Sequence, residues 1–443
     1  MMLFSLLLGN SLVVIAADFN KGYEAYNFGD YETALAEWLP LAEQGEADSQ
    51  FNLALMYSMG KGVLQNHKTA IEWYTKAAEQ GHAKAQFNLA LMYRSGEGVL
   101  QNDKTAEEWY AKAAEQGDAS AQYNLALMYR KGEGVLQNVK TALKWFTKAA
   151  EQGGAAAQVN LGAMYKNGEG VLKNDKTAMK WFTKAAEQGH AIAQYNLGVM
   201  YRSGEGVLQS DKTAAKWYTQ AAEQGYAEAQ YNLAQMYRRG EGVLQNYKIA
   251  VKWYSKAAEQ GHTSAQFNLG LMYDNGLGVP ENYKTAGEWY NKAAEQGHTS
   301  AQYNLAQMYR MGEGVLQNDK IAVKLYTKAA EQGHTSAQFN LGLMYDNGDG
   351  VLENDKTAVE WYTKAAGQGH ATAQFILGYI YGNGEGVLTN RVRAYMWFNL
   401  AQYNGYERSV EFKKTISNKM TAADISKAKE MSSRCLESGY TDC

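Results

Sequence analysis

Apolar residues recur along most of the chain at helical spacing, in pairs of segments joined by short glycine-rich loops. The segment from about residue 83 to residue 95 shows the first half of this pattern. Its Ala85, Leu89, Met92 and Tyr93 are spaced at i, i+4, i+7 and i+8, which places them on one side of an α-helix. The spacing predicts a helix that buries this stripe.

The segment from about residue 104 to residue 115 supplies the second half. Its Ala106, Trp109, Tyr110 and Ala113 are spaced at i, i+3, i+4 and i+7. This predicts a second helix with its own buried stripe, in which alanines allow close approach and aromatic rings fill the remaining volume. The tryptophan recurs in nearly every copy, and a stripe at this spacing indicates core packing rather than ligand stacking.

Turn residues mark where these two helices begin and end. Gly96 is expected to end the first helix, and Gly98 indicates a loop position that needs a positive φ. Asn102 or Asp103 can accept from the free N–H groups of the second helix. Gly117 is expected to cap that helix at its C-terminus and reverse the chain.

The pair of helices is repeated with a fixed period. The string Ala-Glu-Gln-Gly and its single variant recur every 36 residues, which divides residues 42–401 into ten units. A fixed period of this size is typical of an all-α solenoid, because one helix pair cannot bury its apolar stripes without neighbours. Residues 18–41 are predicted to form a shorter capping hairpin that resembles a tetratricopeptide hairpin. Residues 402–443 are predicted to form a C-terminal cap of two helices.

Both ends of the chain bear on its location. Residues 1–17 have no charged side chain and contain an apolar run too short for a good membrane span, which favours a cleaved signal peptide. We therefore expect a periplasmic or secreted protein with no stable membrane insertion after cleavage. The two cysteines, Cys435 and Cys443, are then expected to form a disulfide. The net charge of −3 and the absence of a basic stripe argue against nucleic-acid binding.

The repeat is similar to the Sel-one-like repeat (SLR), a relative of the tetratricopeptide repeat. The resemblance rests on A-x-x-x-L-[AG]-x-M-Y, G-x-G-V and K-[TI]-A-x-x-W-[YF]-x-K-A-A-x-x-G, which together recur from residue 42 to residue 401. It implies a right-handed α/α superhelix that acts as an adaptor or scaffold, often in the bacterial envelope. It also raises an enzymatic alternative, because a cysteine-rich branch has been linked to penicillin binding and β-lactamase activity. None of the ten units contains a cysteine, so that association transfers poorly.

Three series of residues could suggest chemistry, and each has a structural explanation. Six histidines follow the turn at the end of a unit, but equivalent points on adjacent repeats are roughly 10 Å apart, too far for shared metal coordination. They are interpreted as solvent-facing residues at helix starts. The G-E-G loops lack phosphate-loop spacing. Ser58 with Lys61 and Ser426 with Lys429 match the first β-lactamase element only by spacing. We predict no catalytic residue, metal or cofactor.

An asparagine directly before the helix leucine, present in nine of the ten units and replaced by Ile376 in the last, is the most suggestive series. A ladder of amides could hold an extended peptide backbone, or each asparagine could bond the backbone of its own loop. Both interpretations stay open, with the internal one slightly favoured. The candidate partner-binding asparagines are Asn88, Asn124, Asn160, Asn196 and Asn232.

A basic position near the end of the first helix adds a second candidate series, which suggests contact with an acidic or extended peptide. Its members are Arg94, Arg130, Arg202 and Arg238. We therefore predict a monomeric, exported scaffold that binds a protein or peptide partner on a solenoid face. The alternatives are a β-lactamase-like or peptidoglycan-acting enzyme and a binder of cell-wall glycan.

Overall fold

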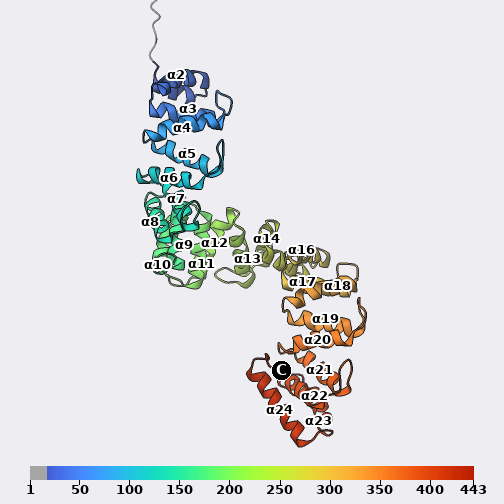
Figure 1. Ribbon diagram of the computed structural model, residues 1–443. Coiled ribbons are helices and arrows are strands. Elements are labelled where there is room, and N and C mark those ends of the chain that lie inside the picture. Colours follow the sequence, from blue (N-terminus) through green and yellow to red (C-terminus); the bar gives the residue numbers. More distant parts are fainter. Residues whose placement is uncertain (1–16) are drawn as a thin grey trace, which may run out of the picture. The chain divides into compact units, whose positions relative to one another are not determined.

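The computed structural model describes residues 17–443, which form 24 α-helices and no strand within that range (Figure 1). The all-α solenoid predicted from the repeat is confirmed. All of the predicted signal peptide except Ala17 lies outside the described residues. Within the described range, no helix is long and apolar enough to cross a membrane.

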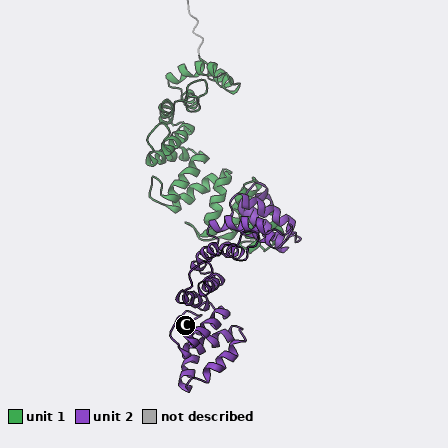
Figure 2. Ribbon diagram, turned by 90° about the vertical axis from the view of Figure 1, so that its right-hand side faces the viewer, with its two compact units in different colours: residues 1–217 green, residues 218–443 purple. Residues whose placement is uncertain are grey.

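The chain divides into two compact units, residues 1–217 and residues 218–443, and the boundary falls inside α12 (Figure 2). The helices that begin in the first unit are α1 Phe19–Asn27, α2 Tyr31–Glu43, α3 Ala47–Met59, α4 His67–Glu79, α5 Ala83–Ser95, α6 Asp103–Glu115, α7 Ala119–Lys131, α8 Val139–Glu151, α9 Ala155–Asn167, α10 Asp175–Glu187, α11 Ala191–Ser203 and α12 Asp211–Glu223. Those of the second unit are α13 Ala227–Arg239, α14 Tyr247–Glu259, α15 Thr263–Asp274, α16 Tyr283–Glu295, α17 Thr299–Met311, α18 Asp319–Glu331, α19 Thr335–Asn347, α20 Asp355–Ala366, α21 Ala371–Asn383, α22 Arg391–Tyr403, α23 Ser409–Ser417 and α24 Ala422–Glu437.

The helix pair α5–α6 shows how local sequence sets each repeat. Gly96 follows α5 in the left-handed conformation, at φ 77°, and its N–H returns to the Met92 carbonyl. Asn102 is the residue that caps α6, because its side chain accepts from the Thr105 N–H at 3.1 Å. Gly98 has φ 74°, and a Cβ there would lie 2.6 Å from the Cβ of His67 in the preceding repeat. Glycine is therefore required both for the backbone angle and for close packing between repeats.

The core of each repeat contains small residues packed around one aromatic ring. Ala106, Tyr110 and Ala113 of α6 have no exposed surface, and Leu89 of α5 is equally buried. The expectation that Trp109 belongs to the buried stripe was only partly right, because Trp109 lies half-buried at the edge of the core. Its outer side is covered by Lys112, whose Nζ lies 3.8 Å from the centre of a Trp109 ring.

A buried glutamine joins successive repeats. Gln122 of α7 is 3 % exposed, and its Nε2 donates to the Ala114 carbonyl at the end of α6, at 3.0 Å. Its Oε1 accepts from Gln152 Nε2 at the end of α8, at 2.8 Å. One side chain therefore connects three consecutive helices, and each of its two buried polar atoms makes a hydrogen bond.

We expect Gln122→Ala to lower the free energy of unfolding by about 2 kcal/mol, because it removes two buried hydrogen bonds and leaves a cavity. Urea denaturation followed by circular dichroism measures this loss. The matched control is Gln101→Ala, which changes an exposed glutamine in a loop and should shift stability by less than about 0.5 kcal/mol. Equal effects of the two substitutions would contradict the linking role.

The repeated histidines begin helices as expected, but they do not face solvent. Each is half-buried, and His334 shows why: its Nδ1 accepts from the Ala337 N–H at 3.2 Å, and its ring stacks on Tyr303 of the preceding repeat with centroids 4.5 Å apart. The same ring pairs join His82, His262, His298 and His370 to aromatic residues. The ring covers the aromatic residue beneath it, which the interpretation as simple surface residues did not anticipate.

Burial lowers the pKa of His298, His334 and His370 below the ordinary value of about 6.5. A lowered pKa means that the folded state holds these rings neutral, so stability is complete above pH 6.5 and falls as the pH drops towards the folded-state pKa. We expect the melting temperature to fall less between pH 7.5 and pH 5 in a variant with all three histidines replaced by asparagine. Parallel slopes in calorimetry would contradict this.

Short helical caps cover both ends of the array. At the N-terminus α1 and α2 bury Trp38, which is 1 % exposed. At the C-terminus α24 packs on α22, and Ser432 Oγ donates to the Met396 carbonyl. A disulfide joins Cys435 to Cys443, with Cα atoms 4.7 Å apart, and ties the last residues to α24.

Candidate functional site

The predicted asparagine ladder lies on the first helix of each repeat, and its amides are used inside the chain. Asn124, Asn160 and Asn196 each donate from Nδ2 to the carbonyl four residues earlier, at 2.8–2.9 Å. Asn88 instead donates to the Tyr74 hydroxyl at 3.3 Å. The internal partner is therefore the helix itself or a core tyrosine, and not the loop that sequence reasoning proposed.

The predicted arginines lie next to these asparagines, one repeat earlier. Arg94 donates from Nη1 to Asn124 Oδ1 at 3.1 Å and from Nη2 to Glu133 Oε2 at 2.9 Å. Arg130 makes the same contacts with Asn160, at 2.9 Å, and with both carboxylate oxygens of Glu169, at 2.8 and 2.9 Å. The two series predicted separately are thus joined into contacts between repeats.

These contacts change the electrostatics expected of the first-unit ridge. Glu133 and Glu169, in the loops of the following repeats, neutralise Arg94 and Arg130, so the ridge is less basic than its own residues indicate. Arg94 also lies near the buried Tyr110. Burial raises the pKa of Tyr110 to about 12, and the positive charge of Arg94 opposes part of that increase.

The remaining candidates vary in their surroundings. Arg202, on α11, and Asn232, on α13, are both half-buried. Arg238 donates to Gln235 Oε1 at 3.0 Å on its own helix. The assignment of these residues to partner binding stays a prediction.

We expect the pair of substitutions Asn124→Ala and Asn196→Ala to lower the free energy of unfolding by roughly 1–2 kcal/mol. Each amide donates to its own helix, and Asn124 also holds Arg94. Thermal and urea melts of the double variant measure the loss. An unchanged melt would favour the alternative, in which the ladder serves only a partner.

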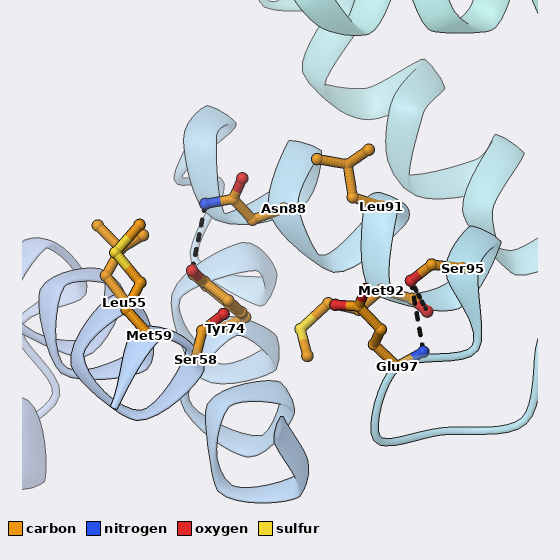
Figure 3. A pocket seen from close by; sticks show the side chains of 9 residues that line it. All are labelled: Leu55, Ser58, Met59, Tyr74, Asn88, Leu91, Met92, Ser95 and Glu97. Carbon is orange, nitrogen blue, oxygen red and sulfur yellow. Dashed lines mark hydrogen bonds between the residues drawn. The ribbon is translucent and has the colours of Figure 1, made fainter. Parts of the chain in front are cut away.

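A pocket of about 300 Å³ opens between α3 and α5 in the first unit (Figure 3). Figure 3 shows Asn88 pointing to the Tyr74 hydroxyl, with Ser58 on the α3 side and Glu97 at the loop. Its lining is Leu55, Ser58, Met59, Tyr74, Asn88, Leu91, Met92, Ser95 and Glu97. The pocket combines apolar walls with one carboxylate and one amide.

A second pocket, of about 330 Å³, lies on α7 and the start of α9. Its lining includes Phe87 and Tyr123, the aromatic residues that would carry a histidine ring in other repeats. The following units have Asp118 and Gly154 at the histidine position, so no ring covers these two aromatics. Asn88 and Asn124 occupy the same position of their repeats, which means that both pockets open on the same side of the first helices. We call this side, marked by Leu55, Ser58, Asn88, Leu91, Ser120 and Asn124, the first-helix face.

The two Ser-x-x-Lys sequences that match a β-lactamase element by spacing lie in surroundings that do not favour catalysis. Lys61, three residues after Ser58, lies over the rings of Tyr26 and Tyr31, and its contact with Tyr26 raises its pKa. A raised pKa disfavours a lysine acting as a base at neutral pH. Ser426 and Lys429 are both exposed on α24. Within residues 17–443 no group of three or more histidine, cysteine, aspartate or glutamate side chains could hold a metal ion.

Sequence reasoning predicted Asn88 as a partner-binding residue but missed that role for the other polar residues of the first pocket, Ser58 and Glu97. Ser58 stands where the next two repeats have Arg94 and Arg130, and Glu97 stands where they have Glu133 and Glu169. The substitution is visible in the aligned repeats. Its meaning depends on knowing that the arginine reaches the asparagine and glutamate of the following repeat, which only the structure shows.

The chain belongs to the Sel1 repeat family. Ten copies of the Sel1 repeat match end to end from residue 47 to residue 406, in a frame shifted by five residues from the one used for residues 42–401. Members of this family are generally scaffolds for protein–protein interaction, and the solenoid fold is typically non-enzymatic.

Two solved structures are similar over much of the chain. One is c5321, a protective antigen present in uropathogenic Escherichia coli strains that displays an SLR fold. It is 37 % identical, with a TM-score of 0.66, and the match covers 91 % of this chain and 94 % of that one. The other is a Sel1 repeat protein from Oxalobacter formigenes, 34 % identical with a TM-score of 0.55, covering 70 % of this chain and 90 % of that one. No curated protein sequence matches the chain.

Proposed function

We propose that this protein is an exported interaction scaffold that holds an extended polypeptide on the first-helix face of its first unit. The observation that carries the proposal is the pair of pockets on that face. Each pocket lies where other repeats have a larger side chain. At the first pocket Ser58 replaces an arginine, and at the second Asp118 and Gly154 replace histidines. These departures from the repeat leave recognition surface without disturbing the helices.

The composition of the face suits a peptide partner. Leu91 is 38 % exposed beside the first pocket, and Phe87 and Tyr123 are half-buried at the second. Apolar walls with a few polar groups are what side chains of an extended ligand need for affinity and orientation. Pockets on successive repeats can take alternate residues of one such segment, as in other groove-binding modes.

Export is part of the proposal and rests on different features. The apolar residues 1–17 favour a signal peptide, and the Cys435–Cys443 disulfide suits an oxidising compartment. Free cytoplasmic protein with residues 1–17 intact would contradict this part.

We expect a photo-crosslinking residue at Leu91 to capture a protein partner in intact cells, because Leu91 is exposed at the rim of the first pocket. The measurement is a crosslinked band identified by mass spectrometry. The matched control places the same residue at Glu108, which is exposed on the second helix of that repeat.

The band at Leu91 should weaken when Gly154 is changed to His, because the new ring would cover Tyr123 as other histidines cover their aromatic neighbours. A Cβ at residue 154 would lie 3.2 Å from the Ala149 carbonyl, so only a small adjustment is needed. Equal capture at Leu91 and Glu108 would contradict binding on the first-helix face.

A further inference from the structure

The first pocket lies where other repeats place an arginine side chain. In the next repeat, Arg94 fills the equivalent space and contacts Asn124 and Glu133 while lying near Tyr110. The residues at these positions around the pocket are Asn88, Glu97 and Tyr74. Ser58 replaces the arginine, and its side chain is too short to reach them.

The polar groups left by this replacement are ready to accept a cation. Asn88 uses its Nδ2 on the Tyr74 hydroxyl, and within the described chain its Oδ1 and the Glu97 carboxylate make no hydrogen bond. Glu97 is exposed, whereas its counterparts Glu133 and Glu169 are half-buried under arginines. The pocket thus presents one amide oxygen and one carboxylate, the two acceptors that Arg94 and Arg130 use.

Other repeats also replace the arginine, but there the new side chain forms a contact within the chain. In the first unit Lys166 still reaches Glu205, at 3.5 Å. In the second unit Asp274 and Asp346 accept from the hydroxyls of Tyr290 and Tyr362, at 2.9 and 3.1 Å. These internal contacts distinguish the Ser58 position, which opens onto the pocket.

The Gly382 position, also in the second unit, is covered by a neighbouring helix. A Cβ at residue 382 would lie 3.7 Å from Ile416 of α23. A pocket of about 220 Å³ remains beside Gly382, but its lining includes Arg391 and Lys419 and no carboxylate. The pocket at Ser58 differs because the Glu97 carboxylate lines it.

We propose that the pocket between α3 and α5 binds an arginine side chain of the partner polypeptide. Its guanidinium group donates to Asn88 Oδ1 and the Glu97 carboxylate, and its stem lies against Leu55 and Leu91. Arginine is favoured over lysine, because its planar fork can serve two acceptors at once, as Arg130 does with Glu169. The inference rests on the proposed function in that the arginine belongs to a polypeptide on the first-helix face.

The test uses the full chain and a small probe, N-acetyl-arginine methylamide, titrated in calorimetry and in saturation-transfer NMR. The matched probe is the citrulline analogue, which has nearly the same shape but no charge. We expect the arginine probe to bind at one site and the citrulline probe to bind at least about tenfold more weakly, as loss of a charged hydrogen-bond partner predicts. Equal affinities would overturn the proposal.

Three variants locate the site. Ser58→Arg should fill the pocket as Arg94 fills its own and abolish probe binding, with a melting temperature no lower than that of the parent. Glu97→Gln should weaken the arginine probe about tenfold or more. Glu169→Gln is the matched control, because that carboxylate is already bound by Arg130, and probe binding should be unchanged.

Arg94→Ser provides the converse test, because it should create a second pocket of the same kind and raise the stoichiometry from one to two. If the arginine probe binds the Ser58→Arg variant as well as the parent, the arginine assignment is overturned. The scaffold proposal still stands in that case if the crosslinker at Leu91 captures a partner. Probe binding without any captured partner overturns the scaffold proposal instead.

Discussion

The array depends on the buried glutamine that joins each repeat to the next. Gln122 accepts from one neighbouring glutamine and donates to the end of the preceding helix, so three helices are held in one arrangement. Apolar packing alone would let similar helices slide against each other, because alanine-rich surfaces are nearly uniform. A buried polar group must keep its hydrogen bonds, so it fixes which residues meet. The close approach at Gly98 then has only one partner, His67.

Because the spacing between repeats is fixed, the effect of a substitution in one repeat can be judged from the equivalent residue in the others. When every repeat places its side chains alike, a single short residue leaves a vacancy whose shape and polarity are set by its neighbours. Ser58 leaves acceptors that elsewhere bind arginine, and Gly154 leaves a tyrosine that elsewhere lies under a histidine ring. In the proposed function, binding surface arises in this way without a new loop or an inserted domain, and the cost in stability falls on one repeat alone.

The repeated pattern within the chain therefore serves the fold, while we propose that its exceptions serve recognition. The asparagines and arginines that looked most suggestive in the sequence are largely engaged inside the molecule, Asn124 with Arg94 and Asn160 with Arg130. Asn88 is different because its arginine is absent. The basic ridge suggested an acidic or extended peptide, whereas our proposal places a basic side chain at the first pocket, where Glu97 has no arginine partner.

The sequence by itself determined the helix pairs, their caps and their number, because turn residues and apolar spacing act over a few residues and recur without slipping. It predicted α5 as residues 83–95 and the role of Gly96, since both depend on local backbone preferences. It could not show that Trp109 lies at the edge of the core, that His334 covers Tyr303, or that Arg94 reaches Glu133. Those contacts join residues about 30 to 40 positions apart, and only the packing of one repeat on the next brings them together.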